Sequence, residues 1–172
     1  MNEEKEIRIA GIVRESIVDG PGIRFTLFVQ GCPHHCPECH NPQTHDFNGG
    51  QTVTHEKILN AIFENHLLSG VTFSGGEPFM QAKSLYLIGK KIKEKGLSLI
   101  TYTGFLFEDL LIMGKENPYI MKLIELNDYI MDGKFEIEKK TYNKTFVGSA
   151  NQRIIDVKKT IENNYKVTEK DF

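Results

Sequence analysis

Three cysteines crowded into one short segment are the side chains of this sequence best suited to metal chemistry. Cys32, Cys36 and Cys39 lie within eight residues, and the chain contains no other cysteine. An odd number of cysteines argues against a disulfide framework, and thiolates this close together repel one another unless a metal neutralises their charge. The pattern therefore predicts that the three thiols share a metal centre.

Two kinds of metal centre are compatible with this segment. Zinc would take the three thiolates and one imidazole, supplied by His34, His35 or His40. A [4Fe–4S] cluster would be held by the three thiolates alone, which leaves one iron with an open position for another ligand. Zinc-binding knuckles usually draw their ligands from two separated pairs, whereas this sequence has one isolated group. The cluster is therefore favoured, and zinc stays as the alternative.

A second segment could hold the polar end of a small ligand. Residues 71–73 read as a short strand, and Ser74, Gly75, Gly76 and Glu77 follow it directly. Paired glycines allow a close backbone approach and expose N–H and C=O groups to a ligand. An ordinary turn between a strand and a helix has the same composition, so this segment alone does not decide between a ligand-binding edge and a turn.

Short strands alternate with helical segments along the chain. Residues 24–30 read as a strand that leads directly into the cysteines, and residues 54–66 read as a helix with Thr54 as its N-cap. A second helix is predicted over 81–95, with Gly96 ending it. Further strands are predicted over 97–101, 129–131 and 153–157, shorter helical pieces over 107–112 and 119–126, and a loose polar tail over 158–172.

This alternation predicts an α/β fold with a parallel sheet and right-handed crossovers. A complete eight-stranded barrel needs about 200 residues or more. The 172 residues are therefore expected to form a partial, open (β/α) barrel, in a single domain over 1–172. In such folds ligands bind beyond the carboxyl ends of the strands. The cysteines follow the strand at 24–30, so they are expected at the ligand-binding edge.

The composition argues against several classes of function. The 21 Lys and Arg against 23 Asp and Glu give a net charge of −2, which argues against nucleic-acid binding through a basic face. No apolar run approaches the roughly 18 residues that a membrane-spanning helix requires. The first six residues lack the apolar stretch of a secretory signal, and a cytoplasmic location is expected.

The C-x3-C-x2-C spacing of Cys32, Cys36 and Cys39, taken with the Gly-Gly-Glu-Pro segment, resembles the radical S-adenosylmethionine (SAM) enzymes. The resemblance implies a partial barrel, a [4Fe–4S] cluster on the three cysteines, and SAM as the ligand of the open iron. It assigns the methionine end of SAM to four residues, Ser74, Gly75, Gly76 and Glu77. His40 is the candidate for stacking on adenine, because many members of the superfamily carry an aromatic residue beside the last cysteine.

Further segments resemble one branch of the superfamily, the glycyl-radical activating enzymes. Residues 19–24 (Asp-Gly-Pro-Gly-Ile-Arg) look like their D-G-P-G-x-R motif, and residues 39–44 are similar to their stretch after the third cysteine. Residues 148–157 resemble the closing motif of the activase for anaerobic ribonucleotide reductase. The resemblance covers residues 10–157, nearly the whole chain.

The resemblance implies an iron–sulfur activase that cleaves SAM reductively and generates a glycyl radical on a partner protein. The implied partner is the large subunit of anaerobic ribonucleoside-triphosphate reductase, and the implied electron donor is flavodoxin or ferredoxin. A deoxyadenosyl radical formed from SAM would remove hydrogen from the glycine Cα. The cofactors would supply this chemistry, so no side chain is expected to act as a catalytic acid or base.

Three other functions are compatible with parts of the sequence. The chain could activate a glycyl-radical enzyme of the formate-lyase type, or it could be a zinc-binding interaction module. It could also be another small radical SAM enzyme, such as one that makes deazapurines, although the closing motif disfavours this. In the favoured interpretation, Gly76→Val is expected to weaken SAM binding and leave the cluster in place, because a branched side chain blocks close backbone approach.

Overall fold

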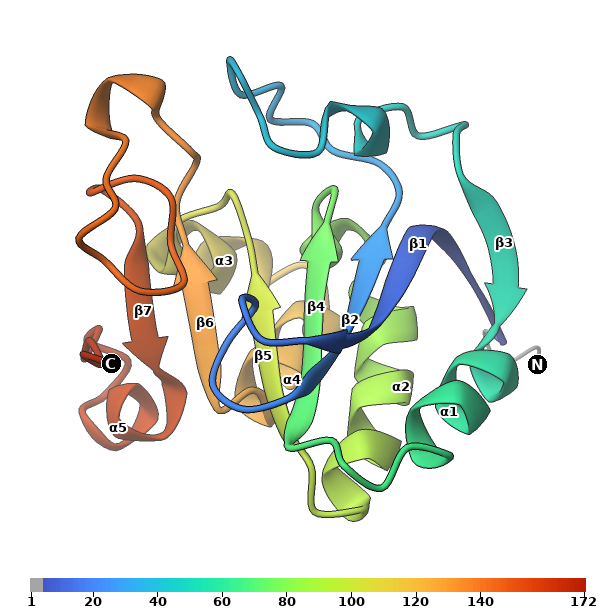
Figure 1. The fold of residues 1–172 in the computed structure, drawn as a ribbon. Helices are drawn as coiled ribbons and strands as arrows, with labels where there is room; N and C mark the ends of the chain where they lie inside the picture. The colour runs from blue at the N-terminus through green and yellow to red at the C-terminus, as the bar shows by residue number, and fades with distance from the viewer. Residues whose placement is uncertain (1–4) are drawn as a thin grey trace.

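The computed structural model describes residues 5–172, which form one open sheet with helices packed mainly on one of its faces (Figure 1). The seven strands follow the order β3-β1-β2-β4-β5-β6-β7 across the sheet. They are β1 (Glu6–Ser16), β2 (Arg24–Val29), β3 (Gln51–Thr54), β4 (Gly70–Gly75), β5 (Ser98–Tyr102), β6 (Tyr129–Asp132) and β7 (Arg153–Asp156). The helices are α1 (His55–Phe63), α2 (Ala82–Glu94), α3 (Phe107–Met113), α4 (Pro118–Leu126) and α5 (Val157–Glu162), with short 3-10 helices η1 (Pro42–Thr44), η2 (Pro78–Gln81) and η3 (Ile137–Lys139).

Four neighbouring strands, β2, β4, β5 and β6, run parallel at the centre of the sheet. Val29 at the end of β2 lies opposite Gly75 at the end of β4, and Phe73 of β4 lies opposite Thr101 of β5. The loops that follow these strands therefore leave the sheet at the same edge, which is the upper edge in Figure 1. This register brings the cysteine segment after β2 next to the glycine-rich segment after β4.

The sheet is mixed, because antiparallel strands flank the expected parallel strands on both sides. β1, β3 and β7 run antiparallel to their neighbours. The sequence pattern does not predict β1 and β3, because Ile7 and Ile9 are the only deeply buried apolar residues of β1, and β3 is a four-residue edge strand with none. β7 runs antiparallel because the chain returns from β6 without an α-helical crossover.

The two edge strands, β3 and β7, stand at opposite ends of the strand order and do not pair with each other. The sheet therefore stays open and does not close into a complete barrel. Together with the central parallel strands, this confirms the expected α/β fold with a partial, open barrel.

The helices form where the apolar spacing predicts them, and local signals set their ends. α1 begins after Thr54, whose side-chain oxygen accepts a hydrogen bond from the Lys57 N–H at 3.2 Å, which confirms the predicted cap. α2 ends two residues before Gly96, whose φ of +80° favours glycine. None of the helices within residues 5–172 combines the length and apolar composition needed to cross a bilayer.

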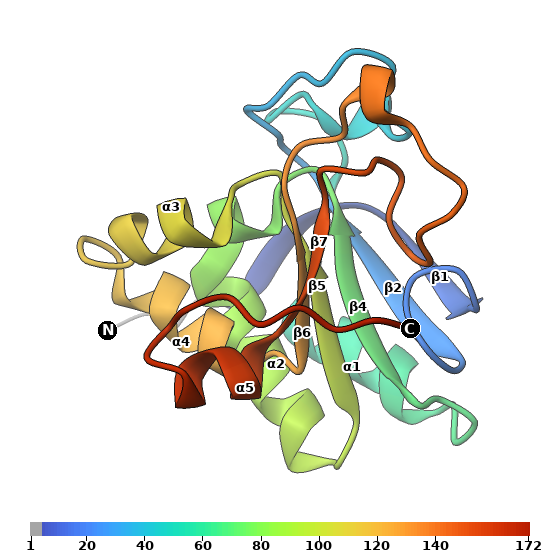
Figure 2. The same cartoon turned by 90° about the vertical axis from the view of Figure 1, so that its left-hand side faces the viewer.

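Successive residues of the central strands face opposite sides of the sheet. Leu99 and Ile130 belong to the main core, which the sheet shares with α1, α2, α3 and α4. Their neighbours Ile100 and Met131 belong to a smaller apolar cluster on the other face, with Val147 from the connection between β6 and β7. Figure 2 shows the helices on one side of the sheet and the connection between β1 and β2 on the other. The second face is therefore covered by irregular segments and not by helices.

The end of the chain differs from the loose tail expected over 158–172. The Asp156 N–H donates to the Thr168 carbonyl at 2.8 Å, and the Lys170 N–H donates to the Ile154 carbonyl at 2.8 Å. These bonds pair the last residues with the outer edge of β7, whose backbone groups an edge strand would otherwise leave exposed. The polar composition of the tail gives no sign of this backbone pairing.

Candidate metal centre

The cysteine loop, defined here as residues 30–45, begins at the carboxyl end of β2. Backbone hydrogen bonds join its two ends, because the Gly31 N–H donates to the Thr44 carbonyl at 2.7 Å and the Cys32 N–H donates to the His45 carbonyl at 3.1 Å. The loop is therefore closed at its base by its own backbone, and the cysteines lie within the closed segment.

Two residues of the cysteine loop adopt a conformation that favours glycine. His35 has a φ of 49° and Glu38 has a φ of 54°, both in the left-handed region. Such residues cost on the order of 1–3 kcal/mol each and persist where the surroundings hold them in place. The Cys39 N–H donates to the Cys36 carbonyl at 3.2 Å, which makes a tight turn that contains Glu38. Apart from the prolines of the loop, no sequence pattern predicts this strain.

The three thiols are free, with Cys32 buried and the other two half-buried. Burial is the largest influence on the pKa of Cys32, which it raises, and it also raises the pKa of Cys36, where the neighbouring Cys39 adds to the effect. Cys32 and Cys36 are therefore protonated at neutral pH when no metal is present. Metal binding must displace these protons, because thiolates and not thiols are the ligands.

The donor set of the loop fits a cluster better than a single ion. Within residues 5–172, no three His, Cys, Asp or Glu side chains lie close enough together to hold one ion. Zinc needs four donors around one ion, whereas a [4Fe–4S] cluster takes each thiolate on a different iron and so spreads its ligands apart. Three free thiols in one loop supply the thiolates of a cluster with one open iron.

The two glycines after β4 are packed against the cysteine loop. Gly75 has a φ of +100°, and a Cβ at Gly76 would lie 2.4 Å from the carbonyl oxygen of Gly31. The Gly76 N–H donates to the Val29 carbonyl at 2.8 Å, and the Glu77 N–H donates to the Gly31 carbonyl at 2.8 Å. A neighbouring backbone thus passes close to both positions, which explains why they are glycines. The sequence alone does not reveal this packing.

The carboxylate of Glu77 points into the protein, where its side chain is fully buried. Its Oε1 atom accepts hydrogen bonds from His34 Nε2 at 2.7 Å and from the Gly104 N–H at 2.7 Å. The Thr103 hydroxyl lies 2.8 Å from Oε1, and the Phe79 N–H donates to Oε2 at 2.9 Å. An ionised carboxylate can only accept, so the tautomer of His34 with its proton on Nε2 is the one that fits this contact. Protein groups therefore occupy both oxygens of the carboxylate.

His34, Thr103 and Gly104 are the members of this arrangement that the motifs do not single out. His34 enters the sequence argument only as a candidate zinc ligand, and its contact with Glu77 spans 43 residues of the chain. Thr103 and Gly104 lie 26 and 27 residues from Glu77. No local pattern connects positions so far apart, and the shared edge of the sheet is what brings them together.

His40 lies away from the glycine-rich segment. It is exposed, and its ring packs against Phe135 after β6, with the ring centroids 4.8 Å apart. The structure therefore brings the three cysteines, Ser74, the two glycines and Glu77 to one edge, and it places His40 on the side of the loop that faces the connection from β6 to β7. Its contact with adenine stays a prediction.

The Asp-Gly-Pro-Gly-Ile-Arg motif lies at the opposite end of the strands from the cysteines. Arg24 is fully buried, and it donates to the Thr72 hydroxyl and to the Ser98 hydroxyl at 2.8 Å each. Burial lowers the pKa of Arg24 to about 10, so the guanidinium still carries its charge at neutral pH. Thr26 and Ser16 both donate to the carboxylate of Asp19. In this structure the motif fastens the amino ends of the strands.

The closing motif fixes the connection that reaches over the site. Arg153 donates to both carboxylate oxygens of the buried Asp132, at 3.0 and 2.5 Å. Gln152 accepts from the Gly148 N–H at 2.9 Å and donates to the Gly133 carbonyl at 3.1 Å. These bonds tie the end of β6 to the start of β7, and so hold the segment that includes Phe135 beside the cysteine loop.

Comparison with known proteins gives one consistent family. Residues 18–155 match the family described as a 4Fe-4S single cluster domain. The anaerobic ribonucleoside-triphosphate reductase-activating protein of Escherichia coli (strain K12) is 32% identical across 79% of this chain and 90% of that protein. Its counterpart in Salmonella typhimurium is 33% identical over the same shares. The pyruvate formate-lyase 1-activating enzyme of Escherichia coli (strain K12) is 34% identical across 87% of this chain and 61% of that enzyme.

Among solved structures, QueE from Escherichia coli aligns with a TM-score of 0.46 and 18% identity, over 58% of this chain and 52% of that one. A likeness at this level bears on neither fold nor function. The family model and the relatives do, and the residues that the family model matches, 18–155, include the cysteine loop, the glycine-rich segment and most of the closing motif. The chain belongs to the iron–sulfur activating enzymes of the radical SAM superfamily, whose cofactors are a [4Fe–4S] cluster and SAM.

Proposed function

We propose that this chain cleaves SAM reductively and generates the glycyl radical of anaerobic ribonucleotide reductase, on the large subunit of that enzyme. The observation that carries the proposal is the share of each relative's length that this chain covers. The chain spans 90% of the reductase-activating protein but 61% of the formate-lyase activase, although the identities are similar. The closing motif, with its clamp between Arg153 and Asp132, adds to this support because its sequence resembles the reductase branch.

In this proposal Cys32, Cys36 and Cys39 hold the cluster, and the backbone around Ser74 and the paired glycines faces the methionine end of SAM. When bound, the reduced cluster supplies the electron that cleaves SAM, and cleavage yields the radical that takes hydrogen from the partner's glycine. The position of the thiols at the end of β2, level with the end of β4, supports this assignment. His40 is the proposed contact of adenine.

The residues of this chain bind, orient and exclude water, and none of them needs to exchange a proton with the substrate. Glu77 is already bonded by its neighbours, so its proposed part in the site is to set the backbone beside the glycines and not to contact SAM with its carboxylate. The proposed place of entry for the partner's glycine loop is the carboxyl edge of the central strands, beside the cysteine loop (Figure 1). The electron comes from an external donor, flavodoxin or ferredoxin.

The test is to mix the reconstituted protein anaerobically with the reductase large subunit of the same cell, SAM and a reductant. A glycyl-radical doublet in the electron paramagnetic resonance (EPR) spectrum is expected, which requires SAM and disappears when the radical glycine of the partner is changed to alanine. A doublet that forms only on a formate-lyase-type partner would contradict the proposed target while leaving the family assignment intact.

A further inference from the structure

A buried side-chain contact joins the middle of the cysteine loop to the ends of β4 and β5. His34 lies between the first two cysteines, and its Nε2 atom is 2.7 Å from Oε1 of Glu77. The His34 side chain is 6% exposed and the Glu77 side chain is not exposed at all. A hydrogen bond to a carboxylate is stronger where water cannot compete for either partner. The contact is therefore well placed to hold the loop.

The other partners of the carboxylate are fixed in the framework of the sheet. Thr103 and Gly104 follow β5, and Phe79 lies in η2 directly after the glycine-rich segment. Without its bond to His34, the carboxylate would be held by these groups alone, and the cysteine loop would lose its side-chain tie to them. The cost of separating a buried hydrogen-bonded pair favours the closed arrangement.

The shape of the pocket around the imidazole gives independent support. The ring of His34 packs edge-on against Phe105, with the ring centroids 4.5 Å apart. A Cβ at Gly104 would lie 2.4 Å from Cδ2 of His34, so the imidazole occupies space that only a glycine leaves free. Two neighbouring positions after β5 are thus fitted to this one side chain of the loop.

We propose that His34 is a positioning residue: its bond to Glu77 fixes the cysteine loop relative to the glycine-rich segment, so that cluster and SAM meet in one geometry. The part that concerns SAM rests on the proposed function. The part that concerns the loop does not, because it is argued from contacts between residues of this chain alone. His34 acts through Glu77 and the backbone, and it touches neither cofactor in this proposal.

His35 offers a matched control in the same loop. It lies between the same two cysteines, but it is exposed and packs edge-on against His45, with the ring centroids 5.3 Å apart. Its φ of 49° is one that asparagine tolerates. His35→Asn therefore removes an imidazole from the loop without touching the bond to Glu77.

The first experiment measures iodoacetamide labelling of Cys32 in the protein without cofactors, quantified by mass spectrometry. His34→Leu is expected to raise the labelling rate about tenfold, because a buried thiol reacts through local opening of its loop. His34→Gln should stay within about threefold of wild type, since its amide N–H can replace the Nε2 donor. His35→Asn should match the wild type. If His34→Leu fails to fold, Glu77→Gln gives the same test, because it replaces one acceptor oxygen of the carboxylate that bonds His34 with a donor group.

The second experiment uses the reconstituted protein, and it measures iron loss to a chelator and the change that SAM causes in the EPR spectrum of the reduced cluster. His34→Leu should lose iron faster and need more SAM for the same spectral change, and His34→Gln should restore both. Wild-type behaviour of His34→Leu in both experiments would overturn the proposal. Equal damage in His34→Gln would also overturn it, because ring packing would then hold the loop. A wild type that takes up no cluster would contradict the proposed function. The labelling rates would still show whether the bond between His34 and Glu77 holds the cysteine loop.

Discussion

Two buried charges, Arg24 and Glu77, hold opposite ends of the same parallel strands, and they are bonded in different ways. Arg24 lies at the amino ends and donates to Thr72 of β4 and Ser98 of β5, so it joins one strand to its neighbours. Glu77 lies at the carboxyl ends and accepts from Gly104 after β5 and from His34 in the cysteine loop. The amino end fastens strand to strand, whereas the carboxyl end fastens the strands to a loop that carries three thiols.

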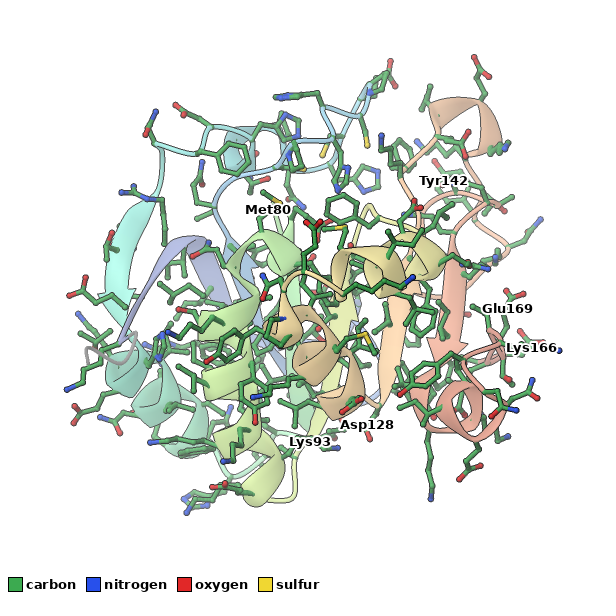
Figure 3. All side chains as sticks on the ribbon, turned by 180° about the vertical axis from the view of Figure 1, so that it is seen from behind. Met80, Lys93, Asp128, Tyr142, Lys166 and Glu169 are labelled. Atoms are coloured by element: carbon green, nitrogen blue, oxygen red, sulfur yellow. The ribbon has the colours of Figure 1, made fainter. Side chains whose placement is uncertain are left out.

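Figure 3 shows how far apart the two ends lie. Met80, which follows the glycine-rich segment, is at the upper end, and the Lys93 and Asp128 pair is at the lower end. The pair is 2.7 Å apart and about one-third exposed, at 33% and 38%. Changes at the lower end should therefore alter the stability of the fold, and changes at the upper end should alter the binding of the cluster and of SAM.

The largest effect is expected from Cys32→Ala, Cys36→Ala or Cys39→Ala. Two remaining thiolates cannot hold a cluster that needs three protein ligands, so cluster content and SAM cleavage should both fall to background. Iron and sulfide analysis after anaerobic reconstitution checks the first, and chromatography of the cleavage products checks the second. A variant that keeps full cluster content and cleavage would show that its cysteine is not a ligand.

Gly76→Ala should cost the cluster as well as SAM binding. Its Cβ would press against the Gly31 carbonyl at 2.4 Å, and Gly31 adjoins Cys32, so the loop must move. This replaces the expectation that a side chain at this glycine spares the cluster.

Gly96→Ala is the matched control for this change. Gly96 also has a positive φ, of +80°, but no atom lies within 4 Å of a Cβ placed there. It should lower the free energy of unfolding by about 1 kcal/mol and leave cluster content unchanged. A Gly76→Ala protein that keeps its cluster and loses only SAM binding would show that the glycine serves the ligand and not the loop.

Arg24→Met should lower the free energy of unfolding by about 2–4 kcal/mol, because several buried acceptors lose their donor. Urea titration followed by circular dichroism measures this. The fraction that stays folded should take up cluster as the wild type does, since Arg24 lies at the opposite end of the strands from the thiols. A specific loss of cluster in fully folded protein would contradict the view that the amino ends of the strands affect stability and not cofactor binding.

The smallest effect is expected from Lys93→Ala. Its ion pair with Asp128 is partly exposed and therefore worth only about 0.5 kcal/mol. The same urea titration should detect a slight shift of the midpoint, with cluster content and SAM cleavage unchanged. A drop in cleavage would show that this end of the molecule communicates with the cysteine loop.

The sequence predicts the central part of the molecule because its signals are local. The apolar spacing of α1 and α2 and the cap at Thr54 depend on residues a few positions apart. The cysteine spacing and the paired glycines also lie within short segments, so they too can be recognised. β1 and β3 escape prediction because few of their residues are buried, and the backbone pairing of the chain end depends on contact with β7.

The inward turn of the Glu77 carboxylate could not be predicted from the motif. It depends on His34 and Gly104, which are 43 and 27 residues away along the chain. The motif identifies the residue, but only the register of β2, β4 and β5 decides which groups surround it. The same holds for the glycines, whose packing against Gly31 is a consequence of parallel pairing.

The most direct test of the central claim is anaerobic reconstitution of the wild-type protein, with iron, sulfide and zinc measured in the same sample and SAM then added with a strong reductant. About four irons and four sulfides per chain are expected, together with 5′-deoxyadenosine and methionine that form only in the reduced sample. Stoichiometric zinc without iron, in protein made with ample iron, would contradict the claim, and so would a full cluster that leaves SAM intact.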